Sequence, residues 1–138
     1  EIEIDMGDGI RVNGRIDLVK QVVQDGLEKT AIIDFKTANK QVKEEINTQQ
    51  LKIYALGYRE LTGKTADYME IYHLDSQNSA SDTITPDVIT AVTEDIKNAA
   101  DRIRNNHLPR KCSKEKCSRC HLNYLCLGKK EQKEYVNE

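Results

Sequence analysis

The sequence predicts a mixed α/β (α+β) domain, whose central sheet includes an antiparallel three-stranded meander and is flanked by helices. Three observations support this fold class. Apolar and polar residues alternate through much of residues 1–36. Apolar residues then recur at three- and four-residue steps over residues 42–61, and again after Thr85. A strand-like run, Tyr68 to Leu74, separates these two helical segments.

The predicted meander occupies the first part of the chain. Ile2 and Ile4 alternate with acidic residues, and the Gly-Asp-Gly sequence at residues 7–9 supplies a turn before the alternation resumes. A second run, residues 14–23, precedes an Asp-Gly pair, which is a strong signal for a two-residue hairpin turn. Residues 31–36 are typical of a mostly buried strand. Three strands joined by short turns predict the meander.

Two helices and one further strand are predicted after the meander. Residues 42–61 are expected to form an amphipathic helix that ends near Gly63. Residues 76–81, which follow the next strand, are polar and without periodicity and predict a loop. Thr85 is suited to cap a second helix and Pro86 to its first position, and the apolar residues from Val88 to Ile103 would form its buried face.

The composition excludes some classes of protein. The 138 residues include no run of about 18 apolar residues that could cross a bilayer, and no secretory signal opens the chain. We therefore expect a protein of the reducing cytoplasm with no membrane partner. The missing start methionine predicts a fragment of a longer protein. Basic residues gather after Arg102, and composition alone favours a solvated helical surface and tail over a nucleic-acid surface as the explanation.

Two carboxylates and a lysine form the first candidate site. Asp34 and Lys36 are two residues apart and would share one face of a strand, opposite Ile33 and Phe35. Pairing through the Asp-Gly turn would bring Asp17 from the neighbouring strand close to Asp34. Two adjacent carboxylates favour a hard divalent cation such as Mg²⁺ or Mn²⁺. An exposed ion pair at a sheet edge is the alternative interpretation.

The order of three motifs adds a family resemblance. Gly-Arg-Ile-Asp-Leu-Val at residues 14–19, Ile-Ile-Asp-Phe-Lys-Thr at residues 32–37 and Gln-Leu-Lys-Ile-Tyr at residues 50–54 together resemble the PD-(D/E)XK nuclease superfamily, in its RecB-like branch. The resemblance extends from Ile2 to about Cys126. It implies a restriction-endonuclease-like core over residues 1–108, without the family's N-terminal helix, and a cysteine-rich metal-binding cap with a charged tail over residues 109–138.

The resemblance also implies roles for single residues. Asp17, Asp34 and the main-chain carbonyl of Phe35 would bind Mg²⁺ or Mn²⁺, and Lys36 would be the catalytic lysine. Gln50 and Tyr54, four residues apart on one helical face, would reach the same cleft, although a buried tyrosine with a hydrogen-bonded glutamine is the structural alternative. Thr37 is a weaker candidate for a phosphate contact.

RecB-like nucleases usually carry a histidine or glutamate of the metal site on the helix that this chain lacks. The three histidines of the chain do not occupy that position and are expected to be ordinary histidines: His73, His107 and His121.

Four cysteines form the second candidate site. Cys112, Cys117, Cys120 and Cys126 are the only cysteines of the chain. Four thiolates suit tetrahedral zinc or an iron–sulfur cluster, and the spacing does not choose between them. The last three resemble the C-terminal cysteines of iron–sulfur nucleases of the AddB type. The resemblance therefore favours a structural four-iron four-sulfur cluster, with Zn²⁺ as the alternative.

The leading functional hypothesis is a metal-dependent DNA exonuclease domain of a RecB-like repair or recombination helicase-nuclease, acting on single strands or duplex ends. The helicase would be in the same chain or in a partner subunit. The alternative is a catalytically weak or inactive nuclease-fold module that binds single-stranded DNA beside a helicase motor. Basic residues of the cysteine segment are the candidate DNA contacts: Lys111, Lys114, Lys116 and Arg119.

Overall fold

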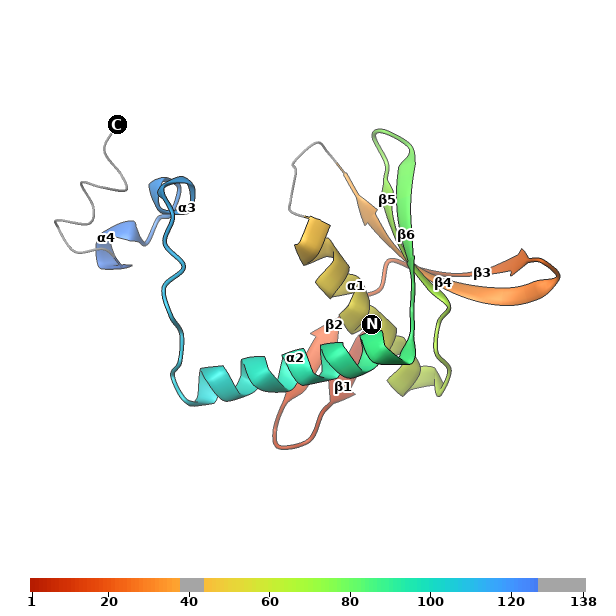
Figure 1. Cartoon of the computed structure of the whole chain (residues 1–138), viewed down its shortest axis with the longest axis horizontal. Coiled ribbons are helices and arrows are strands. Elements are labelled where there is room, and N and C mark those ends of the chain that lie inside the picture. The colour runs from red at the N-terminus through yellow and green to blue at the C-terminus, as the bar shows by residue number, and fades with distance from the viewer. Residues whose placement is uncertain (38–43, 127–138) are drawn as a thin grey trace. The chain divides into compact units, whose positions relative to one another are not determined.

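The fold is described from a computed structural model, which describes residues 1–37 and 44–126, with the backbone alone for residues 44–47. The chain divides into two compact units, Glu1–Arg102 and Ile103–Glu138. Each unit is described by itself. The first contains both sheets and nearly all of the two long helices (Figure 1).

The first unit begins with a separate two-stranded sheet. Strand β1 (Ile2–Asp5) pairs antiparallel with β2 (Arg11–Gly14), so that Ile2 lies opposite Gly14. The turn between them is closed by a 2.9 Å hydrogen bond from the Ile10 amide to the Gly7 carbonyl. Its Gly-Asp-Gly residues all have positive φ angles, which explains why two glycines stand there.

The second sheet has four strands in the order β3-β4-β5-β6. Strands β3 (Leu18–Gln24) and β4 (Leu27–Lys36) form an antiparallel hairpin around the predicted Asp-Gly turn. Strand β4 then runs parallel to β5 (Tyr68–His73), which pairs antiparallel with β6 (Asn78–Thr83). The mixed sheet and the flanking helices confirm the predicted fold class.

The meander differs from its prediction, because the first run and the second run do not continue one sheet. Strands β2 and β3 belong to different sheets and are separated by residues 15–17. A Cβ atom on Gly14 would lie 3.0 Å from the Tyr54 ring and 3.3 Å from Ile2, so the chain passes close to α1 at this point. Beyond it, Asp17 makes a side-chain hydrogen bond to β4 instead of a backbone ladder bond. The predicted meander is therefore two hairpins.

The predicted loop at residues 76–81 is also wrong in part, since Asn78–Thr83 form strand β6. Every residue of β6 is exposed, which is why the sequence shows no alternation there. Its backbone is instead paired along its whole length with β5. Backbone pairing at a sheet edge needs no apolar side chains.

Both long helices form as predicted. Helix α1 (Glu44–Thr62) ends at Gly63, whose φ angle is +69° and whose amide donates to the Arg59 carbonyl at 2.8 Å. Residues 42 and 43 of the predicted helix lie outside the described part of the chain. Helix α2 (Pro86–Arg104) begins after Thr85, whose hydroxyl accepts a 3.3 Å hydrogen bond from the Val88 amide.

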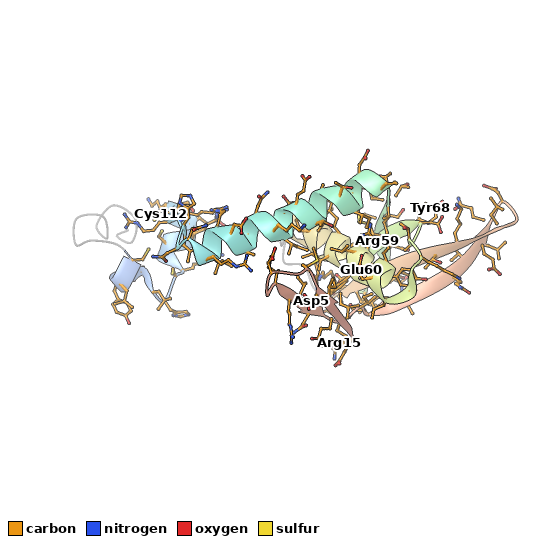
Figure 2. The ribbon with its side chains drawn as sticks, turned by 90° about the horizontal axis from the view of Figure 1, so that it is seen from below. Asp5, Arg15, Arg59, Glu60, Tyr68 and Cys112 are labelled. Carbon is orange, nitrogen blue, oxygen red and sulfur yellow. The ribbon has the colours of Figure 1, made fainter. Side chains whose placement is uncertain are left out.

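The core of the first unit forms around α1, which contacts β1 as well as β4 and β5 (Figure 1). Gly57 allows the closest approach, because a Cβ atom there would lie 2.5 Å from Ile2 Cδ1. The exposed side of α1 carries the ion pair of Arg59 with Glu60, at 3.0 Å (Figure 2). The largest fully buried side chains come from β4, α1 and α2: Ile32, Leu56, Ile89 and Val92.

The second unit contains two short helices, α3 (Lys114–Ser118) and α4 (Asn123–Cys126). Ser113 caps α3 by accepting a 3.2 Å hydrogen bond from the Lys116 amide. Among the described residues of the two units, no helix combines the length and the apolar character that a membrane span requires.

Candidate active site

The first candidate site lies at the carboxyl end of β4. Asp34 and Lys36 share the face of β4 that carries Ile32 and packs toward α1. The pairing of Leu18 with Ile33 places Asp17, the residue before β3, across from Asp34. Two carboxylates and one ammonium group therefore come from neighbouring segments at one end of the sheet.

Asp34 is a buried charge with one close partner. The residue is only 3% exposed, and Lys36 Nζ lies 2.6 Å from its Oδ2 atom. Within the described residues, however, no donor meets Asp34 Oδ2 at the angles of a hydrogen bond. Removing a carboxylate from water costs several kcal/mol unless another charge or a metal compensates. This oxygen is thus held by charge attraction alone and can accept a further ligand.

Gln50 and Tyr54 extend this contact from the sheet to α1. Lys36 Nζ donates to Gln50 Oε1 at 3.2 Å, and Gln50 Nε2 donates to the Tyr54 hydroxyl at 2.6 Å. The two partners on opposite sides of the Gln50 amide define which of its atoms faces the lysine. Tyr54 is itself buried in the core. The lysine is therefore oriented by a chain of contacts that ends in the buried core.

Asp17 is exposed and joins the site through the backbone of β4. Its Oδ2 atom accepts a 3.0 Å hydrogen bond from the Phe35 amide. The N–H and C=O groups of one strand residue point to the same side, so the Phe35 carbonyl also faces the segment that carries Asp17. The carboxylate leaves its second oxygen, Oδ1, for another ligand.

These donors fit a hard divalent cation. Asp17 and Asp34 would supply carboxylate oxygens and Phe35 a carbonyl oxygen, which are the ligand types that Mg²⁺ and Mn²⁺ prefer. The buried Asp34 Oδ2 atom without a hydrogen bond is the observation that supports the fit. Within residues 1–37 and 44–126, no three His, Cys, Asp or Glu side chains gather in reach of one ion. Water or substrate oxygens would have to complete the coordination shell, as is usual for Mg²⁺.

The other predicted contact residues are exposed side chains. Thr37 is exposed directly after β4. The predicted DNA contacts Lys111, Lys114, Lys116 and Arg119 belong to the second unit, and all four are exposed there. Arg119 pairs with Glu115 at 2.6 Å on the same unit.

The four cysteines do not form a ligand cage in the structure. Cys117 is buried, whereas the other three cysteines are exposed. Partial desolvation, and after it a hydrogen bond with the Cys117 side chain, raise the pKa of the exposed Cys112 thiol. No described group of three or more such ligands could hold a metal. The arrangement therefore does not support the predicted iron–sulfur cluster.

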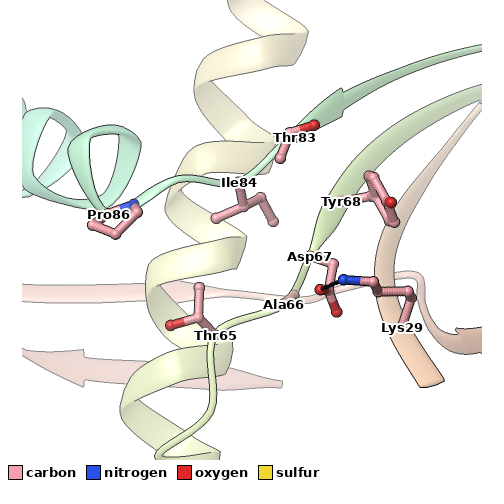
Figure 3. Close-up of a pocket in the computed structure, with 8 residues that line it drawn as sticks. All are labelled: Lys29, Thr65, Ala66, Asp67, Tyr68, Thr83, Ile84 and Pro86. Carbon is pink, nitrogen blue, oxygen red and sulfur yellow. Dashed lines mark hydrogen bonds and ion pairs between the residues drawn. The ribbon is translucent and has the colours of Figure 1, made fainter. Parts of the chain in front are cut away.

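A hollow of about 340 Å³ lies at the opposite end of β4 and β5 from Asp34 (Figure 3). At its rim, Asp67 accepts 2.9 Å hydrogen bonds from Lys29 Nζ and from the Thr30 amide. These two bonds, the Thr30 bond first, lower the pKa of Asp67, and the same ion pair raises the pKa of Lys29. Asp67 thus ties the start of β5 to β4 and has a structural role, which its isolated place in the sequence did not signal.

His73 is the residue near the candidate site that the sequence analysis set aside. The parallel pairing of β4 with β5 puts His73 directly beside Lys36. The sequence predicted both strands, but it did not predict that the strand at residues 68–74 pairs with the strand that carries Lys36.

Comparison with known families gives one match. Residues 1–127 match the profile of the PD-(D/E)XK nuclease superfamily. No curated protein matches the chain.

Proposed function

The chain belongs to the PD-(D/E)XK nuclease superfamily, and we propose that it is a metal-dependent DNA exonuclease domain of the RecB-like type. Members of this superfamily are nuclease-type hydrolases of phosphodiester bonds. The observation that carries the proposal is the contact chain from the buried Asp34 through Lys36 to Gln50 and Tyr54. It joins two residues of the strand motif and two residues of the helix motif through direct contacts.

Each side chain has a defined task in this proposal. Asp17, Asp34 and the Phe35 carbonyl would hold Mg²⁺ or Mn²⁺, which supplies an activated water and neutralises charge on the phosphate. Lys36, whose side chain is 28% exposed, presents an ammonium group that can donate to a phosphate oxygen or orient the attacking water. Gln50 and Tyr54 position the lysine and do not themselves need to touch the substrate.

The substrate class and partners are further parts of the proposal. The spacing of Gln50 and Tyr54 on one helix resembles the RecB-like branch, which supports DNA strands or duplex ends as the substrate and a helicase, in the same chain or a partner subunit, as the neighbour. Thr37 would contact a phosphate next to the reacting bond. The exposed cations of the second unit would add DNA contacts, because basic side chains supply most of the affinity for a phosphate backbone: Lys111, Lys114, Lys116 and Arg119.

The cysteine segment keeps a predicted structural role. Four cysteines within residues 112–126 suit a four-iron four-sulfur cluster or Zn²⁺ by their number and spacing. The described side chains do not gather around such a group, so sequence spacing is its only support.

The test is a nuclease assay on labelled single-stranded and duplex DNA with Mg²⁺ and with Mn²⁺. Asp34→Asn should reduce the cleavage rate by about a hundredfold or more, since the variant loses a charged metal ligand worth several kcal/mol. Asp67→Asn is the matched control, because Asp67 also pairs with a lysine on β4 but at the opposite end of the strand. This control should cleave DNA at close to the wild-type rate.

Three results would contradict the proposal in whole or in part. Cleavage by Asp34→Asn at the wild-type rate would remove Asp34 and its neighbours from the chemistry. Salt-sensitive binding of single strands by the wild-type chain, with no cleavage in either metal, would favour the inactive binding module instead. Cleavage at internal positions of the substrate would show an endonuclease instead of an exonuclease.

A further inference from the structure

A row of polar side chains crosses the sheet beside the candidate active site. Lys36 on β4 pairs with His73 on β5, and His73 pairs with Asn78 on β6. Residues paired across neighbouring strands point to the same face of a sheet. The three side chains therefore lie side by side on the face that carries Asp34, one step beyond it toward the carboxyl ends of β4 and β5.

The composition of this row differs from that of the row before it. Asp34 pairs with Ile71, and Ile71 pairs with Ala80. In this earlier row, the residues on β5 and β6 are therefore apolar. The row that starts at Lys36 instead contains only hydrogen-bonding groups. Ile71 of the earlier row packs against the core, whereas His73 and Asn78 of the polar row are exposed.

The side chains of His73 and Asn78 are available to a ligand. Both residues are exposed. Neither side chain makes a hydrogen bond or ion pair with another residue in the described part of the chain. The nearby turn contains one acidic residue, Asp75, which opposes anion binding but makes an interaction of its own within the protein.

We propose that the row Lys36–His73–Asn78 is a binding track for the phosphate backbone of a single nucleic-acid strand as it leaves the reaction site. This inference rests on the proposed function and adds the path of the substrate. Neighbouring strands are about 4.8 Å apart, so the row is about 10 Å long. A row of this length can contact more than one phosphate of a strand.

The chemistry of the row suits such a backbone. The imidazole and the amide donate hydrogen bonds to phosphate oxygens and are small enough to leave the bases free. Contacts of this kind position a strand without reading its sequence. The track begins at Lys36, which the proposed function already places at the reacting phosphate. A strand held at the next phosphates is fixed in register with the bond to be cut.

The test adds a charge to the track and measures binding instead of cleavage. The probe is a fluorescein-labelled single-stranded oligonucleotide in EDTA, titrated with the full chain at several salt concentrations. Asn78→Lys should tighten binding about threefold or more and steepen the salt dependence by about 0.7 in log–log slope, because it adds one phosphate contact. His73→Ala should weaken binding about fivefold through the loss of one hydrogen bond.

Ser79→Lys is the matched control. Ser79 is the next residue of β6, is equally exposed, and pairs with Tyr72 on the opposite face of the sheet. The track predicts that this variant changes affinity and salt slope much less than Asn78→Lys does. Both variants have the same net charge, so a long-range effect of charge would change them equally.

The outcomes separate this inference from the proposed function. Equal tightening by Asn78→Lys and Ser79→Lys, or none by Asn78→Lys, would overturn the track while the Asp34→Asn assay still supports a nuclease. Wild-type cleavage by Asp34→Asn would overturn the proposed function by a different measurement. Tight binding of duplex DNA with no effect of either lysine would assign the substrate contacts to another surface and would also overturn the track.

Discussion

Asp34 is the residue on which the candidate site depends, because its carboxylate is buried away from water. Its neighbours on β4, Ala31 to Ile33, are buried apolar residues of a central strand. A carboxylate in that position destabilises the fold unless Lys36 or a cation offsets its desolvation. The site is therefore a local exception to the rule that buried strands are apolar, and such exceptions concentrate where function requires them.

The Tyr54 hydroxyl can be removed without disturbing the core. Tyr54→Phe keeps the buried ring but leaves Gln50 Nε2 without its partner at 2.6 Å. We expect DNA cleavage to fall about tenfold, because a group that orients a functional side chain is typically worth 10–100-fold. The free energy of unfolding should change by only about 1 kcal/mol. The measurements are single-turnover cleavage and chemical denaturation.

Tyr58→Phe is the control for this change, one helical turn further along α1. Tyr58 is half-buried against the same core, and its hydroxyl makes no hydrogen bond to another described residue. The Tyr58→Phe variant should therefore cleave DNA at the wild-type rate. An equal loss of activity in the two variants would assign the effect to packing of α1 and not to the Gln50 contact.

The carboxyl of Asp67 should make the stability of the fold depend on pH. Its hydrogen bonds from Thr30 and Lys29 lower its pKa in the folded protein. This stabilisation is complete above the pKa of the unfolded chain and is lost as the pH falls through the lower, folded pKa. The difference in unfolding free energy between wild type and Asp67→Asn should therefore be constant near neutral pH and shrink below about pH 4.

Denaturant titrations at a series of pH values measure this difference. Repeating them in about 1 M salt should reduce it only in part, because screening weakens the Lys29 ion pair more than the bond from the Thr30 amide. Parallel stability curves for the two proteins through the acid range would show that Asp67 does not contribute in this way.

At the scale of elements, the sequence predicted those parts whose side chains carry a periodic pattern. Both long helices have apolar faces and recognisable ends, at Gly63 and at Thr85 with Pro86, and both form where expected. The Asp-Gly turn fixes the β3–β4 hairpin and thereby the position of Asp17 beside β4. These features depend on neighbours in the sequence, which is why the sequence is sufficient to find them.

The elements that were missed depend on contacts distant in sequence. Strand β6 is held by its backbone pairing with β5 and has no apolar face. The break between β2 and β3 comes directly after Gly14, where the chain lies close to Tyr54, 40 residues later in the sequence. The position of His73 beside Lys36 follows from parallel pairing, which no local pattern encodes.

The close contact of α1 with β1 gives a prediction for Gly57. Alanine at this position favours the helix by about 1 kcal/mol, but its Cβ atom would lie 2.5 Å from Ile2 Cδ1 and 3.1 Å from Ile2 Cβ. Overpacking costs about 1–3 kcal/mol, so we expect Gly57→Ala to destabilise the fold on balance. Chemical denaturation measures the change.

A double-mutant cycle with Ile2→Val tests the cause. Valine lacks the Cδ1 atom that makes the shortest contact, so Gly57→Ala should cost less in the Ile2→Val background than in the wild type. An equal cost in the two backgrounds would show that the approach of β1 to α1 is not the limiting contact.

At the scale of the whole chain, the cysteines and a cluster of basic residues lie toward the C-terminus. The net charge is only −2, but the second unit contains the cluster of basic side chains and all four cysteines. The first unit contains the apolar core and the candidate active site. A modest net charge therefore conceals a basic segment that can contact a polyanion.

The predicted cysteine site is tested on anaerobically purified protein by metal analysis and by its ultraviolet–visible spectrum. If a cluster or zinc ion is present, Cys120→Ala should lose it and lower the thermal stability, because metal binding adds to the free energy of folding. Ser118→Ala, an exposed position on α3, is the control and should retain the metal. Loss of the metal with unchanged thermal stability would contradict the structural role.

The alignment of Asp17 with Asp34 limits how the β3–β4 hairpin can vary in length among related sequences. Matched insertions at the Asp25–Gly26 tip, one residue in each arm, leave the two carboxylates opposite each other. An unmatched insertion in one arm must be absorbed as a bulge, or it turns one carboxylate to the other side of the ribbon. Homologous hairpins that retain activity should therefore differ in length by even numbers of residues.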